Sequence, residues 1–261
     1  MVKSITVNGF NMEYAVFGSG ERPFVIIPGL SLHSVMPAAA AVEARYAAGR
    51  EDYTFYLIDR RKNAPEDYTV AQIAEDTAAV LTELGIENAC VFGASQGGMA
   101  AQYIAALHPQ LVGKLALGST LLRTNPIIDA AIGRWVMLAK AGHTDELISD
   151  MLDSIYSQKT LEKYRGAMLA SIGSVSESEL KQFVIMAKAA VGFSAADIIS
   201  GVKCPATVIG SFGDKVTAPE GALELARALG CGLYLYDSSF GHGVYDEAED
   251  YPKRLFDFFR R

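Results

Sequence analysis

The sequence predicts an α/β protein with a mostly parallel, eight-stranded sheet, helices on both of its faces, and an inserted block of helices. In the first and last parts of the chain, short apolar runs alternate with helical patterns. Continuous apolar runs of this length are typical of strands buried on both faces, as in a parallel sheet covered by helices. Between about residues 121 and 201 the pattern is helical throughout. The chain is 50% hydrophobic and 20% charged, which fits a packed globular protein.

Residues 1–120 are expected to form the first part of the core. The expected strands are Ser4–Asn8, Met12–Phe17, Phe24–Ile27, Thr54–Ile58, Ala89–Phe92 and Lys114–Leu117. An Asn-Gly turn separates the first two, so we expect them to pair as an antiparallel hairpin. Thr69 and Gln72 have the spacing of a capping box, which predicts a helix over residues 69–84. A second helix is expected from Gly97 to His108.

Residues 121–201 are expected to form a helical cap, or lid, and residues 202–261 the second part of the core. The cap helices are expected at Ile127–Lys140, Glu146–Tyr156, Leu161–Ile172 and Ser178–Val191. The second part of the core is expected to contain strands Ala206–Ile209 and Leu233–Tyr236 and helices Gly221–Leu229 and Asp246–Phe259. A helical block of this size between two α/β portions is typical of an insert.

The formal net charge is -7, which argues against nucleic acid or an anionic membrane as the main partner, because both favour a basic surface. Cys90, Cys204 and Cys231 are odd in number and widely spaced, which predicts buried free thiols rather than disulfides or a metal site. The N-terminal residues lack a signal-peptide pattern, and no apolar run is long enough to span a bilayer. We expect a soluble, cytoplasmic protein that acts on a small molecule as a monomer or homodimer, without metal or cofactor.

The segment Gly93-Ala94-Ser95-Gln96-Gly97 fits the pattern G-x-S-x-G. The bare pattern is weakly specific, but here it follows an apolar strand and precedes a helix, as a nucleophile on a strained strand-to-helix turn requires. Side chains at the two glycine positions would collide with the neighbouring strand and helix. We therefore interpret Ser95 as a nucleophile. The alternative is a glycine-rich turn whose serine caps the helix.

A serine nucleophile needs a base, and the chain offers four histidines, His33, His108, His143 and His242. His108 precedes a proline at a helix end, where a capping role is expected. His143 lies in the helical block, and His33 lies in a loop where solvation is usual. His242 occupies a glycine-flanked loop before the last helix, and it gives the chain order serine, acid, histidine. His242 is the predicted base.

The acid that orients the histidine is expected after a strand between Ser95 and His242. Strand Ala206–Ile209 runs into a loop that contains Asp214, and catalytic groups gather at the carboxyl ends of strands in open α/β sheets. Asp214 would fix the imidazole tautomer and stabilise the imidazolium. Asp237 is the competing acid, but it lies so close to His242 in sequence that the chain would have to double back.

An oxyanion hole is expected from two backbone N–H groups. The amide of Gln96 lies at the start of the helix that follows Ser95. The amide of Leu30 follows Gly29 in the loop after strand Phe24–Ile27, where glycine allows close backbone approach.

The elbow, the Gly213-Asp214 loop and the Gly241-His242-Gly243 loop occur in an order that resembles the α/β-hydrolase superfamily over nearly the whole chain. The resemblance implies the α/β-hydrolase fold with a helical cap, as in small carboxylesterases, enol-lactonases, carbon–carbon bond hydrolases and aminopeptidases. Serine at the elbow, where haloalkane dehalogenases of this fold carry aspartate, argues against dehalogenation. The chain departs from many relatives at Pro28-Gly29, where they have His-Gly, and at Asp59–Asn63, which lacks the glycines of Asp-x-Arg-Gly-x-Gly.

The expected reaction is hydrolysis of a small carboxylic ester or lactone through an acyl-Ser95 intermediate. The same residues fit a carbon–carbon bond hydrolase, a thioesterase, an aminopeptidase, or a ligand receptor with slow or absent turnover. The cap residues expected to line the substrate pocket are Trp135, Met137, Tyr156, Met168, Phe183 and Met186, with packing inside the cap as the alternative. The acidic cluster Asp145, Glu146, Asp150 and Asp153 would suit a substrate amine, although a solvated helix face also explains it.

Overall fold

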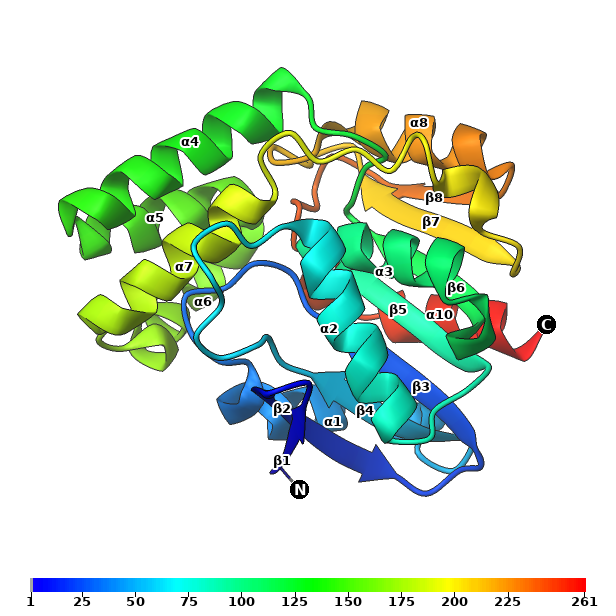
Figure 1. Ribbon diagram of the computed structural model, residues 1–261. Coiled ribbons are helices and arrows are strands. Elements are labelled where there is room, and N and C mark those ends of the chain that lie inside the picture. The colour runs from blue at the N-terminus through cyan, green and yellow to red at the C-terminus, as the bar shows by residue number, and fades with distance from the viewer. Residues whose placement is uncertain (1) are drawn as a thin grey trace.

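The computed structural model describes residues 2–261 and contains one eight-stranded sheet with the strand order β1-β2-β4-β3-β5-β6-β7-β8 (Figure 1). The strands are β1 (Val2–Val7), β2 (Phe10–Gly18), β3 (Arg22–Ile27), β4 (Tyr53–Ile58), β5 (Ala89–Ala94), β6 (Val112–Gly118), β7 (Ala206–Ser211) and β8 (Gly232–Tyr236). The predicted hairpin of β1 and β2 is present, and β2 also pairs antiparallel with β4. From β4 to β8 all neighbouring strands are parallel. The predicted fold class is confirmed.

Helices cover both faces of this sheet. The α-helices of the core are α1 (Ala39–Arg45), α2 (Val70–Glu83), α3 (Gln96–Leu107), α8 (Ala218–Leu229), α9 (Val244–Glu247) and α10 (Tyr251–Arg260). Single helical turns lie at Met36–Ala38, Ala47–Gly49, Pro109–Leu111 and Ile199–Gly201. Figure 1 shows α2 and α3 on the near side of the sheet and α10 on its far side. No helix of residues 2–261 combines the length and the hydrophobicity that crossing a membrane requires.

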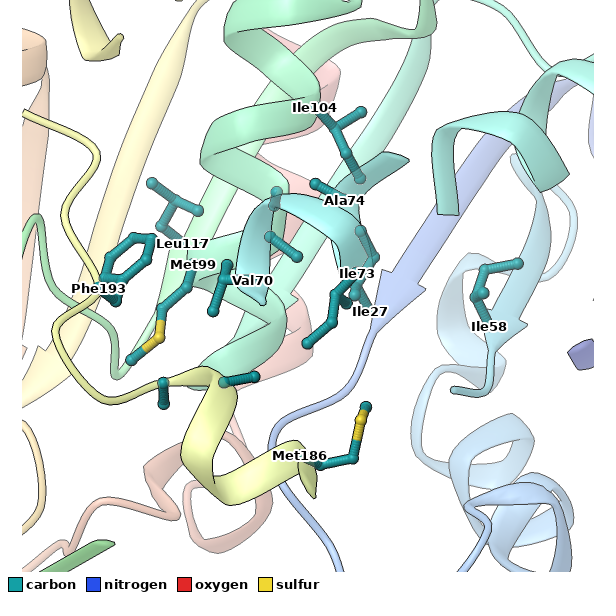
Figure 2. Packing of buried hydrophobic residues seen from close by; sticks show 14 of the residues in the cluster. Ile27, Ile58, Val70, Ile73, Ala74, Met99, Ile104, Leu117, Met186 and Phe193 are labelled. Atoms are coloured by element: carbon teal, nitrogen blue, oxygen red, sulfur yellow. The ribbon is translucent and has the colours of Figure 1, made fainter. Parts of the chain in front are cut away.

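The alternation of side chains along the central strands builds two separate cores. In β5, Ala89 and Val91 belong to the cluster that packs under α2, α3 and α8. Cys90 and Phe92 belong to the cluster on the opposite face, with α10. This follows from the two-residue period of a strand, which points successive side chains to opposite faces. Figure 2 shows part of the first cluster, in which residues of α2 and α3 gather with Ile27 of β3.

Four helices lie between β6 and β7, and we call them the helical block. They are α4 (Pro126–Ala141), α5 (Thr144–Ile155), α6 (Gln158–Ile172) and α7 (Glu177–Ala189). Figure 1 shows them together beside the carboxyl ends of the parallel strands. Their buried residues belong to the same hydrophobic cluster as those of α2 and α3, so the block packs against the core.

Two differences from the sequence prediction have local causes. The predicted helix over residues 246–259 is wrong, because the chain forms α9 and α10 with a break between them. Pro252 has no N–H to donate to the carbonyl of Ala248, and that carbonyl accepts hydrogen bonds from the N–H of Tyr251, at 3.1 Å, and from Arg45, at 2.7 Å. Helix α1 was not predicted, because it has seven residues and no side chain caps its N-terminus.

Candidate active site

Ser95 lies on a sharp turn between β5 and α3, with φ 52° and ψ −120°. A positive φ in a residue other than glycine costs about 1–3 kcal/mol, so the surroundings must hold the turn in place. A Cβ on Gly93 would lie 2.6 Å from the carbonyl oxygen of Gly97, and one on Gly97 would lie 2.1 Å from that of Ile27. The turn therefore requires glycine on both sides of Ser95, as the sequence pattern predicts.

His242 lies within hydrogen-bond distance of Ser95, although 147 positions separate the two residues in sequence. Its Nε2 is 2.9 Å from the Oγ of Ser95, and its Nδ1 is 2.9 Å from the Oδ2 of Asp214. The imidazole is buried, with 2% of the residue exposed. The three predicted residues thus form a continuous chain of hydrogen bonds that ends at the serine hydroxyl.

Asp214 follows β7 and is held as a carboxylate by a set of donors. Oδ1 accepts 2.8 Å hydrogen bonds from the backbone N–H groups of Val216 and Thr217, and Oδ2 accepts one of 2.6 Å from the Thr217 hydroxyl. Burial raises the pKa of Asp214, but the charge of His242 and the hydrogen bonds from His242 and Thr217 outweigh it and hold this pKa below its ordinary value. Asp237, the competing acid, is exposed and accepts a hydrogen bond from the backbone of Ser239.

The loop that carries His242 is fixed against the end of α5. The N–H of Gly243 donates a 2.7 Å hydrogen bond to the carbonyl of Ile155. A Cβ on Gly241 would lie 2.5 Å from the same carbonyl oxygen, and one on Gly243 would lie 2.9 Å from the ring of Tyr156. The two glycines therefore allow the base loop and the helical block to lie in close contact.

The backbone after β3 approaches Ser95 closely. A Cβ on Gly29 would lie 3.0 Å from the Cβ of Ser95. Within residues 2–261, neither the N–H of Leu30 nor that of Gln96 donates a hydrogen bond to another group. Both residues line the cavity at Ser95. Two free amides beside the hydroxyl are what an oxyanion hole requires.

Ser95 and His242 open into a cavity with an empty volume of about 420 Å³, formed between the core and the helical block. The core contributes Gly29, Leu30, Gln96, Met99, Val216 and Tyr245 to its lining. The block and the segment after it contribute Ile128, Ile132, Trp135, Ile155 and Ala190. Apart from His242, this lining has no charged side chain. The cavity suits a small, largely apolar group next to the serine.

Comparison with known proteins agrees with this architecture. A family model described as the alpha/beta hydrolase fold matches residues 22–142. The chain has the α/β-hydrolase fold. An α/β hydrolase enzyme from a Medee basin deep-sea metagenome library has a similar structure, with a TM-score of 0.87, 20% identity, and coverage of 99% of this chain and 98% of that one.

Two other solved structures have the same fold as this chain. The enol-lactonase from Burkholderia xenovorans has a TM-score of 0.85 and 20% identity, over 99% of this chain and 100% of that one. An esterase from Exiguobacterium antarcticum has a TM-score of 0.80 and 18% identity, over the full length of both chains. At this identity the similarity is one of fold.

Of the six cap residues expected at the pocket, Trp135 alone lines the Ser95 cavity. Met137 is 61% exposed, and Met168 is half-buried against the hydrophobic core. Tyr156, Phe183 and Met186 line neighbouring cavities instead. These five residues do not line the Ser95 cavity, because helical periodicity shows which face of a helix is buried, but not what covers it.

The residues that sequence reasoning missed lie on one stripe of α4. Ile128, Ile132 and Trp135 follow each other at spacings of four and three residues, so they share one face of the helix. That stripe is visible in the sequence. Its contact with the cavity depends on how α4 packs over the core, which the sequence pattern does not contain.

The other three histidines have partners away from Ser95. The Nε2 of His108 is 2.9 Å from Glu75, and His143 lies near Glu146. The Nδ1 of His33 is 2.8 Å from the Oε1 of Glu179, which joins the loop after β3 to α7.

The acidic cluster of the block does not face the Ser95 cavity, which none of its four residues lines. Asp150 accepts hydrogen bonds from Arg134 and Trp135, and Asp153 pairs with Arg165. In the described chain, no three His, Cys, Asp or Glu side chains gather as a metal site would need. All three cysteines are free, with Cys90 buried and the other two half-buried.

Proposed function

We propose that this α/β hydrolase cleaves a small carboxylic ester or lactone through an acyl-Ser95 intermediate. The observation that carries the proposal is the chain of hydrogen bonds from Asp214 through His242 to the Ser95 hydroxyl, with both bonds to the imidazole 2.9 Å long. A serine hydroxyl becomes a nucleophile at neutral pH only with such a base in reach.

In the first step, His242 Nε2 accepts the proton of Ser95 as Oγ forms a bond to the substrate carbonyl carbon. The carbonyl oxygen becomes an oxyanion and accepts hydrogen bonds from the N–H groups of Leu30 and Gln96. One such donor is typically worth about 3 kcal/mol of transition-state stabilisation. Asp214 stabilises the imidazolium and keeps its orientation without taking the proton.

In the next steps, the imidazolium of His242 gives its proton to the leaving alkoxide oxygen as the carbon–oxygen bond breaks. The acyl group then remains on Ser95. A water molecule attacks the acyl carbon, His242 accepts one of its protons, and the carboxylic acid leaves as Oγ takes the proton back. In a lactone, the alcohol and the acid stay in one product.

The lining of the cavity supports an ester or a lactone over an aminoacyl amide. A substrate ammonium group needs a carboxylate partner, and among the described residues that line the Ser95 cavity none is Asp or Glu. We also propose that residues 121–201 act as a cap, because the block covers the cavity and supplies its apolar wall.

The test is hydrolysis of 4-nitrophenyl acetate and butyrate by the wild-type protein and by Ser95→Ala and His242→Ala. We expect wild-type turnover, its loss in Ser95→Ala, and a fall in kcat of roughly three orders of magnitude or more in His242→Ala, because the members of such a unit act together. Circular dichroism of each variant checks that the fold persists. A His242→Ala protein that keeps most of its activity would overturn the assignment of the base.

Labelling with a fluorophosphonate separates an enzyme from a receptor built on this fold. Labelling of wild type together with turnover on a panel of esters and lactones supports the enzyme. Labelling of Ser95 without turnover of any ester or lactone would show a reactive serine in a protein with another role.

A further inference from the structure

A second cavity lies behind the loop that carries Leu30. Its empty volume is about 460 Å³. Helix α7 lines one side of this cavity, and the loop that follows β3 lines a second side. The residues that follow β4 line the third side. These last residues are Asp59, Arg60, Arg61 and Lys62, so the cavity brings cations next to the proposed oxyanion loop.

Three buried nitrogen atoms at this cavity have no hydrogen-bond partner. They are Nη2 of Arg60, Nε of Arg61 and Nε2 of His33. A buried polar group without a partner costs about 1–3 kcal/mol, and more when the group is charged. Seven side-chain atoms of the described residues are unsatisfied in this way, and three of them line this one cavity. Two of the three nitrogens belong to arginines, so the carboxylates and hydroxyls that line the cavity leave part of its N–H donors without an acceptor.

Arg60 is the cation with the least compensation. The one hydrogen bond of its guanidinium within residues 2–261 runs from Nη1 to the Oγ of Ser31, at 2.7 Å. The carboxylate of Asp59 accepts hydrogen bonds from the Ser34 hydroxyl and from the backbone N–H groups of Val35 and Arg60. It forms no ion pair with the guanidinium. Burial lowers the pKa of Arg60, and the nearby charge of Asp59 offsets this effect only in part.

Glu179, the acidic residue that α7 contributes to this cavity, already has hydrogen-bond partners. Glu179 accepts hydrogen bonds from the backbone and the hydroxyl of Ser176, and its Oε1 is 2.8 Å from the Nδ1 of His33. Arg61 has a partner for Nη1 in Asp76, at 3.1 Å. Arg60 is thus the cation of this cavity that an incoming anion would compensate most.

Arg60 is also close to the Ser95 cavity. It shares a small cavity of about 350 Å³ with Gln96, whose amide belongs to the proposed oxyanion hole. Tyr245 lines the Ser95 cavity and is near enough for the charge of Arg60 to lower the pKa of its hydroxyl, although burial raises this pKa more strongly. Ser31, which accepts the Arg60 hydrogen bond, directly follows Leu30.

We propose that Arg60 binds a carboxylate group carried by the substrate, so that the ester or lactone is held by its anionic end while its carbonyl lies at Ser95. This inference rests on the proposed function and specifies its substrate class. A carboxylate carries one negative charge in a planar group, which matches a single guanidinium. Because the protein has a net charge of -7, an anionic substrate needs a local cation of this kind.

The test compares pairs of 4-nitrophenyl esters that differ by a terminal carboxylate. The hydrogen adipate, pimelate and suberate esters are paired with the hexanoate, heptanoate and octanoate esters, and Ser95→Ala gives the background rate. The readout is the ratio of kcat/KM within each pair. We expect the wild type to favour the carboxylate in at least one pair, and Arg60→Met to lower that ratio by about tenfold or more, which is the effect of one charge-assisted hydrogen bond. Arg60→Lys keeps most of the ratio because it keeps the charge.

Lys62→Met is the matched control, because it removes the same charge two positions away. The Nζ of Lys62 is 2.8 Å from Glu13, so this cation already has a counter-ion. We expect its ratio to stay close to that of wild type. An equal fall in Lys62→Met would show general attraction between charges and overturn the proposal.

Other outcomes separate this inference from the proposed function. Arg60→Met could slow both members of a pair equally, which would assign Arg60 to holding the Ser31 loop and overturn the carboxylate site. Wild-type turnover of the neutral esters without any preference for a carboxylate would overturn it as well. A wild type that turns over no ester of either kind would overturn the proposed function itself. In that case, binding of the adipate dianion by wild type and by Arg60→Met, measured by calorimetry, decides the anion site on its own.

Discussion

Both carboxylate oxygens of Asp214 have hydrogen-bond partners. Its two oxygens accept hydrogen bonds from two backbone amides and a hydroxyl, and Oδ2 also lies beside the imidazole of His242. An amide at this position keeps the shape but presents an NH₂ donor or an uncharged acceptor to Nδ1. We predict that Asp214→Asn lowers kcat by about four orders of magnitude because the imidazole loses its productive tautomer. Asp237→Asn is the control, and its esterase activity should equal that of wild type.

The same variant tests whether the negative charge of Asp214 also stabilises the fold. A carboxyl group whose folded pKa is lowered stabilises the fold above its unfolded pKa of about 4, and this contribution is lost as the pH falls through the lower folded pKa. We therefore expect the unfolding free energy of wild type to fall more steeply below about pH 4 than that of Asp214→Asn. Urea unfolding across this range measures both slopes. Parallel curves for the two proteins would contradict the expectation.

The sequence indicated which residues meet at the hydroxyl, since each carries its own signal. Ser95 lies between two glycines, and His242 lies between two more, because both loops touch other backbone closely. Asp214 follows a strand end. Arg60 gave no comparable signal, because its missing partner becomes visible only when the loops after β3 and β4 are placed together.

At the scale of elements, two helical glycines can be compared, one in a close backbone contact and one in open space. A Cβ on Gly97 at the start of α3 would lie 2.1 Å from the backbone oxygen of Ile27 at the end of β3, whereas a Cβ on Gly133 in α4 meets nothing within 4 Å. We predict that Gly97→Ala destabilises the protein by about 3 kcal/mol or more and displaces the proposed oxyanion loop. Gly133→Ala should stabilise it by about 0.5–1 kcal/mol, because alanine favours a helix interior.

Chemical denaturation of both variants, followed by circular dichroism, checks this pair, and their esterase rates report on the loop. If Gly97→Ala were as stable and as active as wild type, the close approach of α3 to the end of β3 would be refuted. A loss of stability in Gly133→Ala would show that its helix face is covered.

Helix α2 was predictable to within a residue at each end, because Thr69 and Gln72 satisfy each other's backbone groups as a capping box. The break before Pro252 was not predicted, although the proline is present in the sequence. Helical periodicity continued across it, and the arginine that donates to the carbonyl of Ala248 comes from α1, more than half the chain away.

For the whole molecule, the cavity at Ser95 depends on how α4 lies over the core. Ile132 lines that cavity and is 4% exposed, whereas Ile127 on the same helix is 48% exposed. We predict that Ile132→Phe lowers kcat/KM for 4-nitrophenyl butyrate about tenfold more than for the acetate, because the larger ring occupies acyl space. Ile127→Phe should leave both rates unchanged. An Ile132→Phe protein without chain-length discrimination would place the acyl group elsewhere.

The sheet as a whole was predictable from its parts. Eight strands were predicted and eight are present, and the continuous apolar runs of the central strands predicted helices on both faces. The position of the helical block over the strand ends was not predictable from the sequence. Its buried residues belong to one cluster with those of α2 and α3, and the helical period does not show which of these neighbours each residue contacts.

The hydrogen bond from Gly243 to the last carbonyl of α5 has a consequence for protein engineering. Because the backbone next to the imidazole is anchored to the inserted helices, the insert cannot be exchanged or trimmed as an independent specificity module. A grafted helical insert must place the last carbonyl of its second helix at the same point. Otherwise the loop that carries the proton acceptor loses its anchor, and the imidazole is misaligned.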